Sequence, residues 1–411
     1  MNRWFHGCIL SIVSVLVFTG CSDETFVVDQ DEPIAEAEEK IEDCSVAWER
    51  ELLITDIGVI GDARARNNGP WSFGGIMKAL AGSHNEQQFI KSFAESWMQD
   101  QNVDGVIIKA RPRMQDVVLA PWKALSSAGT YDLARAPFDL LAIVYRVDLR
   151  KQGNVGDEAG EGRFVYGVRN ATGQLMPFTV IAEFRLPAKG NKNARTWATQ
   201  WHALGKLTIG SPEYNQKLEE ITNAFTNYGA VNVTQGGYGS AYGNDGDETN
   251  LKQLRTNEIA LDFNSGHAPI WELREFHIGS NGFFHPVHPA LTPINDMNGT
   301  NTLAQYVQQN SAKIQAGTHK VPVTFKGSLF AGGGIAVPTN AFTWSVPGVS
   351  AALQEKFSLQ TCNGCHAGNT GTNFLHVGPG LSGGGTRLSD FLVSVEMPRR
   401  TLELKKALGC Q

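Results

Sequence analysis

Apolar residues recur with two different spacings along the first two thirds of the chain. Four segments place them three and four positions apart, as the buried stripe of an amphipathic helix requires: residues 71–80, 89–98, 197–204 and 218–225. Three segments are runs of β-branched and aromatic residues between Gly, Pro and Asn, as strands are: residues 140–147, 163–168 and 178–184. The pattern predicts an α+β body in which helices and strands are mixed.

The pattern changes in the last part of the chain. Residues 325–347 are rich in Gly, Pro and Ala, and we place a domain boundary there, after residue 330. Ser350 caps a predicted helix that leads to Cys362, and a Gly- and Asn-rich loop follows it. Helices that begin near Ser389 and Pro398 close the chain. We therefore expect a mixed body over residues 44–330 and a small, mostly helical domain over residues 331–411.

The first 20 residues have the features of a secretory signal, with Arg3 in a basic start and an apolar run over residues 9–18. The sequence up to Cys21 resembles a bacterial lipobox. The resemblance implies that residues 1–20 are removed and that acylated Cys21 anchors the protein to a membrane. The residue after Cys21 is Ser22. By resemblance to the sorting rules of Gram-negative lipoproteins, serine in this place indicates the outer membrane. The alternative is ordinary signal cleavage that leaves Cys21 free.

Composition narrows the possible partners. Residues 21–43 are acidic and poor in large apolar side chains, which predicts a flexible, solvated tether. The whole chain is 42% hydrophobic and 18% charged with a net charge of −6, so we expect no nucleic-acid partner. No long apolar segment follows the signal, and the lipid is the expected membrane attachment. An acidic protein of this kind also suits a basic redox partner.

The strongest chemical signal is the sequence Cys362-Asn363-Gly364-Cys365-His366. Two cysteines two residues apart, followed by histidine, are the pattern of covalent c-type haem attachment. Each thiol bonds one vinyl group of the porphyrin, and His366 becomes the proximal iron ligand. With 6 Cys and 10 His in 411 residues, chance yields this pattern only ~0.002 times. We therefore expect one covalent haem c.

A C-x-x-C pair also occurs in redox dithiols and in zinc sites. A redox dithiol normally begins a helix after a strand, whereas a helical pattern precedes Cys362. A zinc site needs more ligands, and the chain has no second C-x-x-C pair. Both alternatives are weaker than haem attachment.

The last 60 or so residues resemble the cytochrome c fold, in which the first and last helices cross and a loop brings a sixth ligand to the iron. Here the candidates for that ligand are His376, which we favour, and Met397, which directly precedes Pro398. An open sixth position, or a ligand supplied by the body, is the third possibility. Glycines around His376 permit the sharp loop that its role requires.

The remaining cysteines suggest a disulfide. Cys8 leaves with the signal, Cys21 takes lipid, and Cys362 and Cys365 take haem, so Cys44 and Cys410 are left. Thioether attachment and disulfides both belong to an oxidising compartment outside the cytoplasm. We expect these two cysteines to pair, with two free thiols as the alternative.

Several charged residues stand inside apolar segments of the body: Arg146, Asp148, Glu161, Arg163, Arg255, Glu258, Glu272, Arg274 and Glu275. Buried charges usually pair, so we interpret these residues mainly as a structural ion-pair network. A substrate pocket lined by arginines is the alternative.

Together these features predict a monohaem c-type cytochrome anchored to the cell outer membrane, facing the periplasm or the cell surface. Electron transfer to a redox partner protein is the first hypothesis. The second is a haem-dependent oxidoreductase whose substrate is held by the N-terminal body, and the third is a binding lipoprotein with a structural haem or metal. The chain also resembles uncharacterised proteobacterial outer-membrane lipoproteins that end in a similar CNGCH segment. The sequence leaves the catalytic residues, the substrate and the oligomeric state open.

Overall fold

The computed structural model describes residues 43–150, 158–188, 193–227, 249–259, 270–289, 291–380 and 385–410. The expected signal peptide, Cys21 and all of the tether except Asp43 lie outside the described residues. Within the described ranges, no helix has both the length and the apolar character needed to cross a membrane.

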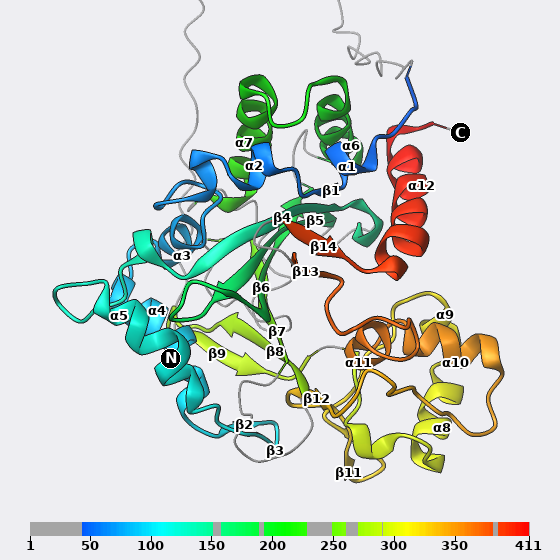
Figure 1. The fold of residues 1–411 in the computed structure, drawn as a ribbon. Helices are drawn as coiled ribbons and strands as arrows, with labels where there is room; N and C mark the ends of the chain where they lie inside the picture. Colours follow the sequence, from blue (N-terminus) through cyan, green and yellow to red (C-terminus); the bar gives the residue numbers. More distant parts are fainter. Residues whose placement is uncertain are drawn as a thin grey trace, which may run out of the picture. The chain divides into compact units, whose positions relative to one another are not determined.

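An antiparallel sheet forms the centre of the fold (Figure 1). Its described strands follow the order β1-β4-β5-β6-β7-β8-β12, and β9 also pairs with β8. The strands are β1 (Leu53–Ile54), β4 (Phe138–Arg146), β5 (Glu158–Arg169), β6 (Leu175–Pro187), β7 (Leu251–Ile259), β8 (Trp271–Ile278), β9 (Phe284–Val287) and β12 (Ile335–Val337). The three strands predicted from the sequence are thereby confirmed as β4, β5 and β6.

Three smaller hairpins accompany the sheet. They pair β2 (Gln101–Val103) with β3 (Val106–Ile108), β10 (Thr324–Phe325) with β11 (Ser328–Leu329), and β13 (Val377–Pro379) with β14 (Thr386–Leu388). Strand β13 lies against β4, β5 and β6 of the main sheet (Figure 1). The last part of the chain therefore runs across the body.

The helices are short. They are α1 (Trp48–Glu51), α2 (Ile57–Ile60), α3 (Phe73–Ala81), α4 (Glu86–Ala94), α5 (Ala120–Ala124), α6 (Ala194–Ala203), α7 (Pro212–Thr226), α8 (Asn301–Gln309), α9 (Ser311–Gln315), α10 (Ala351–Ser358), α11 (Cys362–His366) and α12 (Met397–Leu408). All four predicted body helices are present as α3, α4, α6 and α7. The N-cap Ser211 accepts a hydrogen bond from Tyr214 N (3.2 Å), and Pro212 begins α7.

One face of the sheet is aromatic and carries the helices. Tyr145 of β4 stacks on Trp201 of α6, with ring centroids 4.9 Å apart. Phe184 of β6 packs on Phe225 of α7 at 5.7 Å, and Tyr166 of β5 meets Phe73 of α3 at 5.6 Å. Because side chains alternate along a strand, the residues between these aromatics point to the other face. The mixed α and β composition predicted for the body is confirmed.

A second hydrophobic core lies in the C-terminal part. It contains Leu303 and Val307 of α8, Phe330, Trp344 and Phe357 of α10. Helix α10 begins after Ser350, whose Oγ accepts from Leu353 N (3.3 Å), as the sequence predicts. The helix ends at Ser358, so it does not run on to Cys362.

The boundary expected after residue 330 does not divide the described fold. Strand β12 follows that point, yet Ile335 pairs with Leu273 of β8 in the main sheet. The glycine run that suggested a linker is tightly packed, because a Cβ atom on Gly333 would lie 2.5 Å from Val106, and one on Gly334 would lie 2.8 Å from Ile108. Glycine there permits close approach to the β2–β3 hairpin rather than flexibility.

Helices α10 and α12 belong to different cores. Leu404 and Leu408 of α12 join the main core, and α12 packs on α6. Phe357 of α10 lies in the second core instead. The crossing of first and last helices that the cytochrome c resemblance implies is therefore absent from the described packing, and cytochrome c-like character stays a prediction.

A π-helical turn precedes a helical proline at two places. Residues Gln115–Leu119 come before Pro121 of α5, and Leu392–Glu396 come before Pro398 of α12. Proline has no N–H and its ring collides with the carbonyl one turn earlier, so a wider turn removes the collision. The wide turn lets the chain run directly into α12, whose first turn contains Pro398 as predicted.

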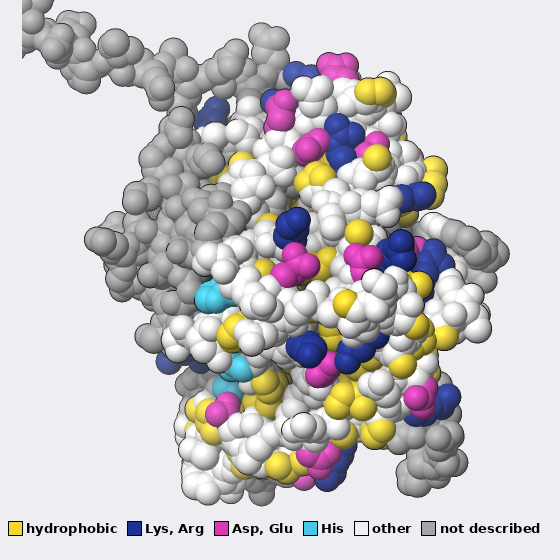
Figure 2. Space-filling view, turned by 90° about the vertical axis from the view of Figure 1, so that its left-hand side faces the viewer, with side chains coloured by type: hydrophobic (Ala, Val, Ile, Leu, Met, Phe, Trp, Pro, Cys, Tyr) yellow, Lys and Arg dark blue, Asp and Glu magenta, His cyan; other side chains and the backbone are white. Residues whose placement is uncertain are grey.

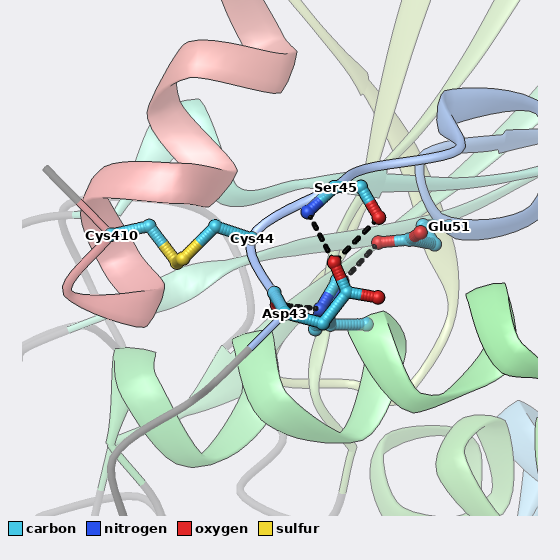
Figure 3. The surroundings of a disulfide bond; sticks show 6 residues. Asp43, Cys44, Ser45, Glu51 and Cys410 are labelled. Carbon is cyan, nitrogen blue, oxygen red and sulfur yellow. Dashed lines mark hydrogen bonds and ion pairs between the residues drawn. A yellow bond between two sulfur atoms is a disulfide. The ribbon is translucent and has the colours of Figure 1, made fainter.

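The predicted disulfide between Cys44 and Cys410 is present (Figure 3). It ties the start of the described chain to the second residue after α12. Nearby, Asp43 accepts hydrogen bonds from Ser45 N (2.8 Å) and Ser45 Oγ (2.6 Å). The same segment is held by His202, whose Nε2 lies 2.9 Å from the carbonyl oxygen of Asp43 and whose Nδ1 lies 2.8 Å from a Glu51 carboxylate oxygen. Both ends of the described chain are thus fixed to the helical side of the sheet.

Figure 2 shows a different side of the protein, the left-hand side of Figure 1. Lys and Arg side chains lie among Asp and Glu side chains there, with apolar side chains between them. The described part of this side therefore carries charge of both signs rather than one extended patch.

Candidate functional site

The predicted attachment motif forms a helical turn of its own. Helix α11 begins after Thr361, whose Oγ1 accepts hydrogen bonds from Gly364 N (3.1 Å) and Trp344 Nε1 (2.8 Å). A Cβ atom on Gly364 would overlap the carbonyl oxygen of Ser358, so only glycine fits there. The glycine of the motif is therefore required by packing.

The two residues between the cysteines are buried, and the cysteines are not. Asn363 is fully buried, accepts from Trp344 Nε1 (2.9 Å) and donates to Asn295 Oδ1 (2.7 Å). Cys362 and Cys365 are partly exposed free thiols. The turn is thus held in place by Asn363, and both cysteine residues remain partly exposed.

His366 is held in one orientation. Its Nδ1 lies 2.6 Å from the carbonyl oxygen of Phe374, and its ring stacks on Trp271 with centroids 5.2 Å apart. Because a carbonyl oxygen only accepts, Nδ1 carries the hydrogen and Nε2 keeps its lone pair. Burial lowers the pKa of His366 to about 4, so the imidazole is neutral near pH 7. A neutral imidazole with a hydrogen-bonded Nδ1 is the usual form of a metal-ligating histidine.

His376 lies directly beside His366, with ring centroids 4.6 Å apart. Its Nδ1 is 2.8 Å from Ser389 Oγ, and its Nε2 is 3.1 Å from the carbonyl oxygen of Cys365. The Cys365 Sγ atom is 3.4 Å from the same Nε2. Burial lowers the pKa of His376 well below its usual value, with His366 and Arg400 adding to the effect. Both imidazoles are therefore neutral near pH 7.

Met397, the other candidate for the distal ligand, lies in the main hydrophobic core. Its side chain is fully buried, together with Leu392 and Leu404. The structure thus brings His376 next to the attachment motif, whereas Met397 takes part in core packing.

An apolar cluster lines one side of the motif. Cys362 packs against a cluster that includes Trp271 and Leu273 of β8, Ile335 of β12 and Phe374. The rings of Trp271 and Phe374 are nearly parallel, with centroids 5.7 Å apart. This side of the site excludes water and suits a flat apolar group.

The face of the main sheet that points away from the helices lines another side of the motif, and it carries charged residues. Arg163 of β5 pairs in register with Glu183 of β6, and Arg255 of β7 pairs with Glu275 of β8. Arg255 Nε lies 2.8 Å from Glu275 Oε2, and Arg163 Nη2 lies 2.5 Å from Glu161 Oε2. These contacts confirm the ion-pair network predicted from the sequence.

This charged face is the one that meets the motif. Trp271 and Leu273 share it with Glu275, because alternate residues of β8 point the same way. The same Trp271 stacks on His366, and Leu273 belongs to the cluster around Cys362. The arginines therefore stand on the surface over which the motif lies.

The surroundings disfavour thiolate at the cysteines. Burial raises the pKa of the Cys362 thiol, an effect that Arg255 partly opposes. Burial raises the pKa of Cys365 to about 12, and the negative charge of Glu396 adds to the effect. Both sulfur atoms are therefore protonated near pH 7.

A second buried charge cluster lies on the opposite, aromatic face of the sheet. Glu258 and Glu272 stand directly opposite each other on β7 and β8, and both are buried. Arg274 Nη2 lies 2.7 Å from Glu272 Oε2, and Arg111 Nη2 lies 3.1 Å from the same oxygen. Sequence reasoning named Glu258, Glu272 and Arg274 but missed Arg111, which lies far from them in the sequence.

The predicted helix cap at Ser389 is confirmed, but sequence reasoning missed its contact with His376 and the role of Trp271. Trp271 stacks on His366, and Ser389 both caps the following helical turn at Leu392 N (3.2 Å) and holds His376. An apolar residue in a strand gives no signal of such contact. Comparison with known protein families, curated proteins and solved structures finds no significant match.

Proposed function

We propose that this protein is a monohaem c-type cytochrome that transfers electrons, with haem c attached through Cys362 and Cys365. The observation that carries the proposal is the arrangement of the motif. Two free, partly exposed thiols lie in one helical turn, and next to them stand two neutral imidazoles, of which His366 is held by the hydrogen bond from its Nδ1 to the carbonyl oxygen of Phe374. This is the donor set that c-type attachment uses.

The residues fit the group chemically. His366 suits the proximal position, because its Nε2 lone pair is free and Phe374 and Trp271 fix its ring. His376 suits the distal position after a change of tautomer, because its Nε2–H now donates to the carbonyl oxygen of Cys365 and its Nδ1 accepts from Ser389 Oγ. Met397 is the second candidate. A metal between two imidazole nitrogens needs about 2 Å on each side, so rings with centroids 4.6 Å apart must separate to admit it. Gly371, with φ of +63°, lies in the stretch that carries His376 and permits that movement.

The other uses of a C-x-x-C pair fit less well. Redox dithiols act through a thiol of lowered pKa, whereas burial raises the pKa of Cys365 to about 12. A structural zinc site needs four ligands, and no three His, Cys, Asp or Glu side chains among the described residues are arranged to hold a metal ion. These observations favour thioether attachment.

A haem held there would supply reversible one-electron transfer at its iron. The chain's own residues would exclude water from its apolar side, through Trp271 and Phe374, and fix the proximal imidazole. Electron delivery then needs a redox partner protein. A haem-dependent oxidoreductase is the second candidate, favoured by arginine side chains that stay partly exposed beside the motif.

We propose further that the protein is lipid-anchored through Cys21 in the outer membrane. The Cys44–Cys410 disulfide supports export, since such bonds persist in oxidising compartments. The face of the membrane and the oligomeric state are left open.

The test is haem retention and spectroscopy of the matured full-length protein. Haem should remain bound after denaturation and acid–acetone extraction, and should become extractable or be lost in the C362S/C365S double variant. Low-spin six-coordinate bands would favour electron transfer, and high-spin bands would favour the oxidoreductase. Extractable haem in the parent protein, or no haem at all, would refute attachment.

A further inference from the structure

Arg163 and Arg255, beside the motif, use only some of their N–H groups in the ion-pair network and stay partly exposed. Glu161, Glu183 and Glu275 each have side chains exposed by 2% or less, whereas the side chains of Arg163 and Arg255 are exposed by 15% and 19%. The carboxylates therefore lie beneath, and the accessible part of this surface is cationic.

Both arginines keep a terminal nitrogen for another partner. Arg163 uses Nε and Nη2 on Glu161 and Glu183, and Arg255 uses Nε and Nη1 on Glu275 and Glu183. Among the described residues, no hydrogen bond is made by Nη1 of Arg163 or Nη2 of Arg255. Glu183 contacts both guanidinium groups, so the two are neighbours on adjacent sides of one carboxylate.

Two further arginines have ion pairs of their own. Arg146, at the end of β4, pairs with Asp148 through Nε and Nη2, both at 2.9 Å. Arg400 of α12 is buried and pairs with Glu396 through Nε (3.1 Å) and Nη2 (3.0 Å). Arg163 and Arg255 are therefore distinguished by sharing one carboxylate, that of Glu183.

The cationic surface and the motif share one space. Arg255 lies opposite Glu275 on the face of the sheet that also presents Trp271 and Leu273, and Trp271 stacks on His366 of the motif. The apolar cluster around Trp271 and Phe374 lies on the other side of the same helical turn. A ligand there would meet an apolar wall at one edge and guanidinium groups at another.

We propose that Arg163 and Arg255 form a carboxylate-binding site of the body, beside the haem-attachment motif. The proposal rests on the proposed function in one respect, since the propionate groups of the haem are one source of carboxylate. A free carboxylate ligand is the other source. In both cases guanidinium N–H groups donate to carboxylate oxygens, the pairing for which the planar fork of arginine is best suited. The site gives the otherwise unassigned body a defined role.

The test uses the full mature chain prepared without attached haem and titrates it with haemin, with haemin dimethyl ester and with succinate. Haemin should bind at least about tenfold more tightly than its ester, because the ester has no carboxylate. R163Q and R255Q should remove that preference. R169Q is the matched control, because Arg169 lies on the same strand β5 but pairs with Asp139, and it should bind like the parent.

A variant with the opposite expected effect on haemin binding distinguishes loss of the site from misfolding. Removal of Arg255 leaves Glu183 and Glu275 with less compensation, which can unfold the chain. E275Q removes an anion and frees Arg255 Nε, so it should increase the preference for haemin over the ester while circular dichroism stays native. A lost preference in E275Q would count against the site.

The outcomes separate the two ligand sources. A haemin preference that depends on the arginines assigns the site to propionate. Equal binding of haemin and ester, with succinate binding that R255Q weakens at least about tenfold, assigns it to a free carboxylate. Equal binding without succinate binding overturns the proposal. Covalent haem retention in the matured protein does not depend on these arginines, so it reports on the proposed function separately.

Discussion

His366 Nδ1 lies 2.6 Å from the carbonyl oxygen of Phe374, a residue whose φ of +62° places it in the left-handed region. A phenylalanine seldom adopts this conformation, and the ring of Phe374 packs against Trp271. The unusual backbone turns the carbonyl toward the histidine. The loop after the motif therefore orients His366, the proposed proximal ligand, before the chain reaches His376, the proposed distal one.

This geometry leads to a prediction about the sixth iron ligand. H376A should shift the ferric spectrum toward high spin with little loss of stability, because His376 is only partly buried. M397A should keep the parent spectrum but lower the free energy of unfolding by about 2–5 kcal/mol, because it opens a cavity in the core. Near-infrared spectra and urea unfolding measure the two effects. A methionine–iron band that H376A retains and M397A abolishes would show that the assignment is wrong.

Local sequence patterns were sufficient for much of the body. The capping pair Ser211 and Pro212 and the strand runs appear as predicted, because they depend on neighbouring residues alone. The glycine run before β12 packs against the β2–β3 hairpin and does not separate two parts of the fold. Glycine marks either flexibility or close packing, and only the contact of Gly333 with Val106 decides between them.

The candidate site likewise has one part that local sequence predicts and another part that only the fold assembles. Cys362, Cys365 and His366 are close in sequence, so their spacing alone indicates their chemistry. Arg163 and Arg255 approach the motif only through the register of β5–β8 and the path of the chain after residue 330. Their charges were visible in the sequence, but their common location depends on tertiary pairing that no local pattern encodes.

The disulfide should contribute measurably to stability. Cys44 and Cys410 are 366 residues apart, and closing so long a loop in the unfolded chain is worth about 4–5 kcal/mol in the chain-entropy model. Dithiothreitol should therefore lower the urea midpoint of the parent. The C44S/C410S double variant should unfold at that lower urea midpoint both with and without dithiothreitol. Equal midpoints for parent and variant would argue against a stabilising bond.

Membrane attachment should depend on Cys21. The C21S variant is expected to appear in the soluble fraction, because the described helices include none that could span a membrane. Fractionation of cells and labelling with a radioactive fatty acid measure the effect, with C44S as a control that keeps the lipid. Membrane association of unlabelled C21S would contradict the expected anchor.

The last prediction concerns the pH dependence of stability. Glu258 stands opposite Glu272 and is fully buried, and burial raises its pKa to about 7, an effect that Glu272 strengthens and Arg274 and Arg111 oppose. The folded protein thus holds this proton at pH values where the unfolded chain, with its ordinary pKa of 4.5, has released it. The contribution of Glu258 to the free energy of unfolding is fully present below pH 4.5. It falls by about 3 kcal/mol as the pH rises to about 7.

The E258Q variant isolates this contribution, because glutamine resembles the protonated acid and does not titrate. Relative to the parent, E258Q should gain stability between pH 5 and pH 8, as measured by urea unfolding at each pH. Comparison at each pH cancels the buried histidines, whose lowered pKa values act in the opposite sense. E275Q is the control: although burial alone would raise the pKa of Glu275, Arg255 holds it at about 2, so E275Q should lower stability equally from pH 5 to pH 8. A constant difference between E258Q and the parent across that range would show that Glu258 does not carry the proton.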